Sequence, residues 1–353
     1  MPTAREDFLQ GLTTPSVSAL AGAAGTVYLL AGLSVALVGP GWLTHGNVRW
    51  LASGPEDDYA YVTASVLDRT LSPDPTAQSR ETVVILGGSG TRESLTDEAD
   101  IEHRLAERLG RSVDVLDMTT DAQTVIEGAG LLETVDARPL LVVMGLGGHA
   151  LATTADDLYT PYSMPRLGFR SPVVDSEFEQ LGWPPLRETG WPLVDNRDFY
   201  LVRLPYLPVN LLRGGTSRAQ HRYLGLPPLE PDQIRTDFAD LLDAMRANRD
   251  LHLGVVGRSI DRVRAGGGEV VILEAPASEA WFGTPEESSF YAEVRASFAN
   301  FTASRQVPLW NLDTEARLVH DDFRDPAHLN NTAAQARYTN ALVDRIAREL
   351  QDP

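Results

Sequence analysis

The chain has 353 residues, which is enough for one large domain or for a domain with insertions. Its formal net charge of -19 argues against a nucleic-acid partner and against electrostatic docking on an anionic membrane, because both need a basic face. There is no cysteine, so disulfides, thiolate metal ligands and a cysteine nucleophile are excluded.

The N-terminal region contains an apolar run, residues 17–38, without a charged side chain. As a helix this run would be about 33 Å long, enough to cross a bilayer core of about 30 Å, and it is longer than the apolar core of most signal peptides. We expect one transmembrane helix here, after a tail at 1–16. A buried Ala/Gly-rich helix is the alternative. The flanking arginines barely decide the orientation, and a single-pass protein of the cell membrane with its domain outside the cytoplasm is the simplest arrangement.

The rest of the chain alternates between strand and helix patterns. Short apolar, mostly β-branched runs predict five buried strands, at 82–86, 113–116, 140–144, 269–273 and 308–312. Longer segments with helical spacing lie between and after them, at 97–109, 125–132, 234–264, 290–304 and 332–350. A linker at 39–80, with a helix around 57–71, leads into this region.

This alternation predicts an α/β fold over residues 81–353: a three-layer α/β/α sandwich around a five-stranded parallel, flavodoxin-like sheet. In such folds the functional site lies at the carboxyl ends of the strands. Residues 150–231 break the pattern with ten prolines between 151 and 230, and we interpret them as an insertion. This insertion either shapes a substrate cleft, touching a membrane or an acyl chain through 199–212, or is an irregular cap.

Two short segments far apart carry the candidate chemistry. Gly87-Gly88-Ser89 follows the first predicted strand, and Asp325-Pro-Ala-His328-Leu-Asn lies near the C-terminus. A serine nucleophile needs a base within hydrogen-bond reach and an acid that orients the base. We therefore predict Ser89 as nucleophile, His328 as general base and Asp325 as its orienting partner. The backbone N–H of Ser89 is a candidate oxyanion donor.

These residues resemble the SGNH/GDSL hydrolase superfamily, and more narrowly its membrane-anchored envelope branch, which includes alginate O-acetylation and teichoic-acid D-alanylation proteins. The resemblance implies further oxyanion donors at Thr120, Gly145 and Gly147. The family's second block normally has a glycine where Thr120 stands, and its third block an asparagine where Gly147 stands. A lost donor typically costs about 3–4 kcal/mol of transition-state stabilisation. Such changes favour the anchored, transferase-like members.

Arg92-Glu93 follows the serine, as in many anchored members, and Arg92 is a candidate for contact with an anionic group of the substrate. A salt bridge to Glu93 or to another carboxylate is the alternative reading. His149, two residues beyond Gly147, is a candidate replacement for the missing oxyanion donor. No other histidine has metal-ligand spacing, and we expect neither a metal nor an organic cofactor.

The resemblance implies a membrane-anchored serine esterase or O-acyltransferase that acts on acyl esters of cell-envelope carbohydrate. A transferase would work beside a multi-span membrane protein that delivers acyl groups. Two alternatives remain open: a non-catalytic protein that keeps the fold and binds envelope glycans or proteins, and a dinucleotide-binding protein. The second rests on Gly88-Ser89-Gly90 after a strand, with Asp117 at the end of the next, but Glu93 replaces the third glycine of that fingerprint.

Overall fold

The computed structural model describes most of the chain, namely residues 17–18, 20–23, 25–26, 47–71, 81–135, 140–158, 166–184, 192–218, 221–234, 237–278, 281 and 283–351. The predicted tail and most of the predicted membrane span lie outside these residues. The described part of the span is helical, and its Val17 and Leu20 are exposed. None of the helices within these ranges is both long enough and apolar enough to cross a membrane.

Five parallel strands form one sheet in the order β2-β1-β3-β4-β5, as the strand–helix alternation predicted. The strands are β1 (Thr82–Leu86), β2 (Asp114–Asp117), β3 (Leu140–Leu146), β4 (Glu269–Glu274) and β5 (Leu309–Trp310). β5 is shorter than predicted, because only Leu309 and Trp310 pair with β4. The order 2-1-3-4-5 is the flavodoxin-like one, in which the chain reverses direction across the sheet next to β1.

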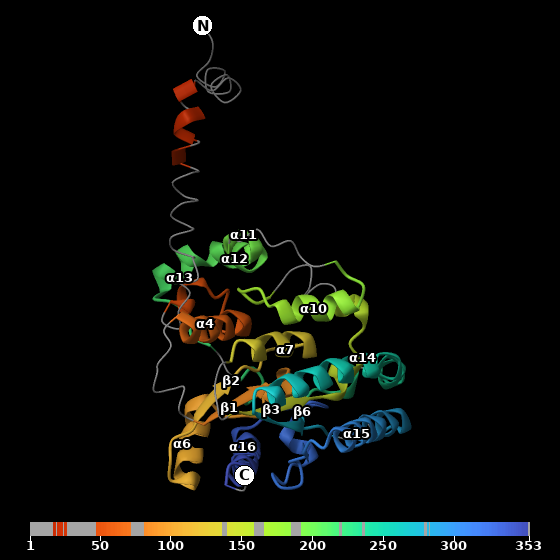
Figure 1. Cartoon of the computed structure of the whole chain (residues 1–353). Helices are drawn as coiled ribbons and strands as arrows, with labels where there is room; N and C mark the ends of the chain where they lie inside the picture. Colours follow the sequence, from red (N-terminus) through yellow and green to blue (C-terminus); the bar gives the residue numbers. More distant parts are fainter. Residues whose placement is uncertain are drawn as a thin grey trace.

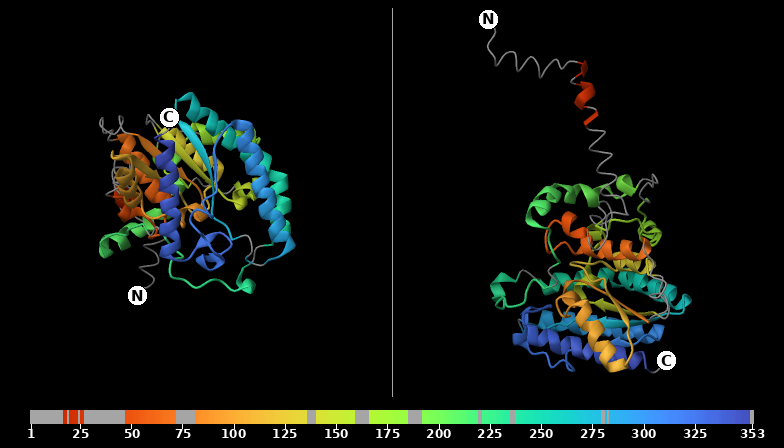
Figure 2. Two further views of the ribbon diagram at one scale, coloured as in Figure 1. Left: turned by 90° about the horizontal axis from the view of Figure 1, so that it is seen from below. Right: turned by 90° about the vertical axis from the view of Figure 1, so that its left-hand side faces the viewer.

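Both faces of the sheet are buried, which explains the continuous apolar runs of its strands. Val84 and Leu86 of β1 belong to one core cluster, and Val83 and Ile85 to the other. Helices cover the two faces (Figures 1 and 2). The first face is covered by α7 (Val125–Glu133) and α14 (Phe238–Ala265), with α15 (Pro285–Arg305) along α14, and the second by α6 (Glu98–Leu109) and α16 (Thr332–Glu349). The result is a three-layer sandwich.

Side-chain caps explain where several helices begin. Asp97 accepts from the backbone N–H of Asp100 at the start of α6, and Asn331 accepts from that of Ala334 at the start of α16. Thr124 and Glu127 form a capping box at the start of α7. Each cap satisfies an N–H group that has no partner inside its helix.

The predicted linker contributes to the domain core. Its helices are α3 (Val48–Leu51) and α4 (Asp58–Leu71). Tyr59 and Val62 of α4 pack in the same cluster as Val84 of the sheet. The apolar face of α4 is therefore buried against the domain that was predicted to begin at residue 81.

The part of the predicted insertion that the structure describes is mostly helical rather than irregular. Its helices are α8 (Gly148–Ala152), α10 (Pro172–Gln180), α11 (Pro192–Asp195), α12 (Arg197–Arg203), η2 (Leu204–Tyr206), α13 (Leu207–Arg213) and, just beyond, η3 (Pro231–Gln233). Phe178 of α10 packs in the first core cluster, whereas Phe199 and Tyr200 of α12 pack with α3 and α4. The C-terminal region adds η4 (His320–Asp322) and the strands β6 (Phe323–Asp325) and β7 (His328–Leu329).

Candidate active site

Ser89 stands immediately beyond the carboxyl end of β1, on a tight turn. Gly87 has a φ of +151°, and a Cβ atom there would lie 2.7 Å from Thr91 Oγ1 and 2.9 Å from the carbonyl oxygen of Gly145. Glycine is therefore required at position 87 by both conformation and space. Gly88 is the N-cap of the short helix α5 (Ser89–Arg92), and Ser89 is its first residue.

Asp325 and His328 face each other on a hairpin. β6 and β7 are antiparallel, Asp325 pairs with His328 across them, and Pro326 and Ala327 form the connection. The Asp325 Oδ1 atom accepts from the backbone N–H groups of Ala327 and His328, at 2.9 and 3.1 Å. Asn330 braces the hairpin, because its Nδ2 donates to the Phe323 carbonyl at 3.1 Å. The spacing of three residues thus reflects a hydrogen-bonded hairpin tip.

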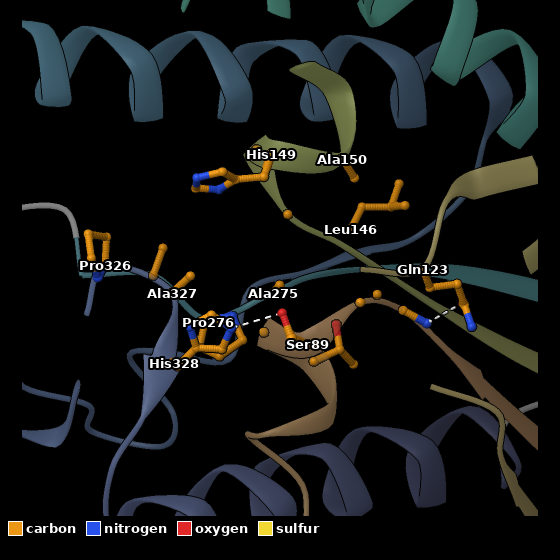
Figure 3. Close-up of a pocket in the computed structure, with 18 of the residues that line it drawn as sticks. Ser89, Gln123, Leu146, His149, Ala150, Ala275, Pro276, Pro326, Ala327 and His328 are labelled. Carbon is orange, nitrogen blue, oxygen red and sulfur yellow. Dashed lines mark hydrogen bonds between the residues drawn. The ribbon is translucent and has the colours of Figure 1, made fainter. Parts of the chain in front are cut away.

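The structure brings Ser89, His328 and Asp325 into one hydrogen-bonded chain, although Ser89 and His328 are 239 positions apart. The distance from Ser89 Oγ to His328 Nε2 is 2.8 Å (Figure 3). On the other side of the ring, His328 Nδ1 lies 2.8 Å from Asp325 Oδ1 and 2.9 Å from Oδ2. These distances match the order nucleophile, base and orienting acid that a triad requires.

A close approach of two loops sets this geometry. A Cβ atom on Gly90 would lie 3.2 Å from the carbonyl oxygen of Ala327. The turn that carries Ser89 and the hairpin that carries His328 therefore meet at Gly90. A larger residue at position 90 would force the two apart or require a shift of the hairpin.

The electrostatics of the triad favour an ionised Asp325. Burial by itself would raise the pKa of this carboxyl, but the hydrogen bond from His328, its charge and two backbone N–H groups outweigh burial and lower the pKa. The ring of His149 lines a cavity beside Ser89 and is exposed to solvent. Desolvation by the surrounding protein, followed by the charge of His328, lowers its pKa.

A strap, residues 221–230, holds the outer side of His328. The Tyr223 ring lies against the imidazole, with ring centroids 4.8 Å apart, and Arg324 lies over the Tyr223 ring. The strap is fixed by hydrogen bonds from the backbone N–H of Arg222 to Glu93, of Gly225 to Asn330 and of Leu229 to Arg324. Sequence reasoning missed Tyr223, because it lies 105 residues before His328 and no local motif marks it.

A cavity of about 490 Å³ adjoins Ser89. It lies at the carboxyl ends of the strands, where the fold predicted a site. Its volume falls within the usual range for small-molecule sites, and its walls are predominantly apolar. The lining includes Leu86, Val125, Met144, Leu146, His149, Leu229, Ile234, Ala275, Pro276 and Tyr291 beside the triad.

The candidate oxyanion donors differ in whether their N–H groups already have a partner inside the protein. The N–H of Ser89 is at the first turn of α5, where a helix has no internal acceptor for it, and Gly147 lines the cavity as the N-cap of α8. The N–H of Thr120 donates to the Gly87 carbonyl at 3.1 Å, so this donor is used inside the protein, and the prediction for it is corrected.

Gly145 lines the cavity within β3, where it pairs with Leu273. A Cβ atom at this position would lie 2.2 Å from Thr91 Oγ1, so glycine is needed here for packing.

Gln123 was not predicted, yet it supports the nucleophile turn. Its Oε1 accepts from the N–H of Gly87 at 2.9 Å, and its Nε2 donates to the Met118 carbonyl at 2.7 Å.

Arg92 does not contact the cavity, and the predicted role in substrate binding is wrong for this structure. The side chain is buried, with Nη1 at 2.7 Å from Glu93 Oε1 and Nε at 3.1 Å from Asp58 Oδ2. Arg218 pairs with the same Asp58 at 3.1 Å. The salt bridge, which was the alternative reading, is therefore what the structure shows. It ties α5 to α4.

Fold and site together define an α/β protein with a serine–histidine–aspartate triad at the carboxyl edge of a parallel sheet. No family model and no curated protein matches the chain. Among solved structures, TesA is similar over 75% of this chain and 98% of its own, at 15% identity and a TM-score of 0.38. The psychrotrophic esterase EstA from Pseudoalteromonas sp., in a structure inhibited by monoethylphosphonate, is similar over 77% and 100%, at 12% identity and a TM-score of 0.37. Because these scores are low, the triad geometry carries the functional argument.

Proposed function

We propose that this protein is a serine acyl hydrolase or O-acyltransferase of the SGNH/GDSL type. The observation that carries the proposal is the 2.8 Å contact between Ser89 Oγ and His328 Nε2, with Asp325 on the other ring nitrogen. A protein that only binds a ligand has no need for this chain of contacts, in which the acid orients the base and the base activates the nucleophile.

The reaction begins when Ser89 Oγ attacks the carbonyl carbon of an ester. The hydroxyl proton moves to His328 Nε2, and the carbonyl oxygen becomes an oxyanion. The C–O bond to the alcohol then breaks, and the proton on His328 goes to the leaving alcohol. The product of this half is an acyl group on Ser89. Water or an acceptor hydroxyl then attacks the acyl-enzyme in the same way and restores the serine.

Asp325 keeps the Nδ1 proton of His328 in place, so that Nε2 faces Ser89 as the acceptor. Its ionised carboxylate stabilises the imidazolium that forms in both halves of the reaction. The N–H groups of Ser89 and Gly147 are the remaining candidates for holding the oxyanion among those that the sequence suggested.

The substrate class follows from the cavity and from the resemblance of the sequence blocks. The apolar walls beside Ser89 suit the acyl part of an ester. The resemblance to envelope proteins supports acylated cell-envelope carbohydrate as substrate, a membrane anchor at 17–38 and a domain outside the cytoplasm. It also supports a multi-span membrane protein as acyl donor if the reaction is a transfer.

The first test is turnover of p-nitrophenyl acetate and longer p-nitrophenyl esters by wild type, Ser89→Ala and His328→Ala. Ser278→Ala is the matched control, because Ser278 Oγ also contacts a histidine, at 3.0 Å from His320 Nδ1, but lies outside the triad. We expect the two triad variants to lose turnover and the Ser278→Ala control to keep it.

Covalent labelling by a fluorophosphonate separates an enzyme from a binding protein. We expect labelling of the wild type and its loss in Ser89→Ala. Turnover that persists in both triad variants would show that the assignment is wrong. A wild type with neither turnover nor labelling would favour the binding protein that keeps this fold.

A further inference from the structure

An apolar surface remains exposed on the insertion. Seven of the eleven exposed large hydrophobic residues in the described part of the chain lie between positions 194 and 212, although scattered single ones would be ordinary. Six of them are on α12, η2 and α13. These are Leu201, Val202, Tyr206, Val209, Leu211 and Leu212, exposed by 61%, 62%, 41%, 40%, 59% and 91%. We name residues 197–213 the apolar ledge.

The ledge is the outer face of helices whose inner face is already packed. Phe199 and Tyr200 are buried against α3 and α4, and Arg203 forms a buried double contact with Asp57, at 2.7 and 2.6 Å. The helices are thus held in place by the domain. Their exposed leucines and valine are what remains after this packing is complete, so they are available to a partner outside the domain.

The charge of the ledge differs from that of the chain. The whole sequence has 49 acidic residues, but the ledge has one, Asp198, which lies 3.8 Å from Arg197, and the stretch 199–217 has none. Arg213 lies at the end of the ledge and is exposed. A surface that is apolar and carries few carboxylates can approach lipid headgroups even when the net charge of the protein is strongly negative, because exposed charges are screened beyond about 8 Å at physiological salt.

The ledge is also joined to the segment that follows the apolar N-terminal run. Asn210 Nδ2 of α13 donates to the carbonyls of Trp50 and Ala52, at 3.1 and 2.9 Å, and the N–H of Thr216 donates to the Arg49 carbonyl at 3.0 Å. The nine residue steps from 38 to 47 span at most about 30 Å when fully extended. Figure 1 shows α11, α12 and α13 at the end of the domain that faces the N-terminal helical residues.

From these observations we propose that the apolar ledge lies in the interface of a lipid bilayer, with Leu201, Val202, Leu211 and Leu212 inserted among the headgroups. The ledge would act as a second contact beside the predicted span. Helices that lie in the interface plane bury an apolar face at the boundary between headgroups and acyl chains. This inference concerns a lipid-binding surface and does not depend on the chemistry of Ser89.

The experiment uses the full chain, whose lack of cysteine allows single labels. Leu201→Cys and Leu212→Cys are labelled with an environment-sensitive fluorophore and reconstituted in vesicles of phosphatidylcholine and phosphatidylglycerol. Val319→Cys is the matched control, because Val319 has the same 59% exposure as Leu211 but lies next to η4. Nitroxide lipids with the quencher near the headgroup are then added to the vesicles.

We expect quenching at positions 201 and 212 to be about fivefold stronger than at 319, since only the ledge would reach the interface. Equal quenching at all three positions would overturn the proposal. A second result would also overturn it: labels that are protected from an aqueous quencher only at high protein density and are not quenched by the nitroxide lipids. In that case a second copy of the chain would cover the ledge. Near-ultraviolet circular dichroism of each variant checks that the fold is intact.

Discussion

The two sides of the His328 ring are built by different parts of the molecule. The side that faces Ser89 belongs to the sheet and its hairpin, where short spacings and required glycines fix the geometry. The other side belongs to the strap, where Tyr223 lies against the ring and Glu93 holds the backbone of Arg222. The triad residues therefore lie at the sheet edge, and the insertion contacts the opposite side of the His328 ring and holds it in position.

This difference separates what each kind of change should do. A substitution at the sheet edge should lower turnover with little effect on stability, because the triad residues are partly exposed and make few core contacts. A substitution in the strap, or in the buried salt bridges of Arg92, should act first on stability or on the position of His328. Four variants test this division.

The largest effect is expected for Asp325→Asn. An amide that donates toward Nδ1 favours the wrong tautomer of His328, and we expect kcat to fall by about 10⁴-fold. Asp321→Asn, on the exposed side of the neighbouring turn, is the control and should keep full activity. Ester turnover that survives in Asp325→Asn would mean that the carboxylate is structural.

Arg92→Met should come next, and its effect should be on stability. Removing one partner of a buried ion pair leaves charges uncompensated, which typically costs about 3–5 kcal/mol. Here the Glu93 and Asp58 carboxylates would lose their contacts with Arg92, although Asp58 keeps its pair with Arg218 and Glu93 its hydrogen bond from the backbone of Arg222. Urea unfolding measures the effect.

Arg246→Met is the control for that measurement, because its pair with Glu293 is exposed. The variant should change the free energy of unfolding little, because an exposed ion pair contributes little to stability. An Arg92→Met variant of normal stability but with a raised KM would restore the role in substrate binding that the structure argues against.

A smaller effect is expected from His221 in the strap, whose protonation should make the free energy of unfolding depend on pH. Burial, followed by the charge of Arg92, lowers the pKa of His221 from 6.5 to about 4. Gln335 Nε2 lies 2.8 Å from its Nδ1, so the neutral ring accepts there. Between these pH values the unfolded chain binds a proton that the folded chain does not, so the free energy of unfolding falls as pH decreases from 6.5 toward 4.

The His221 contribution is at most on the order of 3 kcal/mol. His221→Gln should therefore lose less stability than wild type between about pH 7 and about pH 4.5, as urea unfolding measures it. Asp313, whose pKa is raised to about 7 by burial and by Glu274, acts in the opposite direction over this range. The difference between variants isolates His221, and His103→Gln, at an exposed site, should behave as wild type.

The smallest effect is expected for Tyr223→Ala. Ring contacts of this kind contribute about 0.5–1.5 kcal/mol, which corresponds to a fall in kcat of up to about tenfold. KM should stay unchanged, since Tyr223 positions His328 and is absent from the cavity lining. Tyr223→Phe should restore kcat. A loss of stability in Tyr223→Ala with unchanged kcat would place the residue in the fold only.

Much of the sheet was predictable because parallel strands are buried on both faces. The run 82–86 coincides with β1, and the predicted helix at 97–109 begins one residue before α6, at its cap Asp97. The run 308–312 shrank to two residues, because apolar character does not specify how many residues pair. The insertion was not predictable in detail, since prolines mark turns but do not reveal which short helices lie between them.

The candidate site divides in the same way. Ser89, Asp325 and His328 could be found because their roles leave local marks: a glycine turn after a strand and a spacing of three. Arg92 could not be decided, because a charged residue near a nucleophile is compatible with both substrate contact and internal pairing until its burial is known. Tyr223 and Gln123 act through contacts across the fold and have no local signal.

The separation of Ser89 and His328 by 239 positions also has a consequence for biosynthesis. The nucleophile turn leaves the ribosome well before the hairpin that carries its base, and domains of this size fold largely as units. A nascent chain therefore carries Ser89 without its histidine until the hairpin has been made and has docked. Labelling of Ser89 by a fluorophosphonate should then report the docking of this hairpin, and chains that stall before residue 325 should not be labelled.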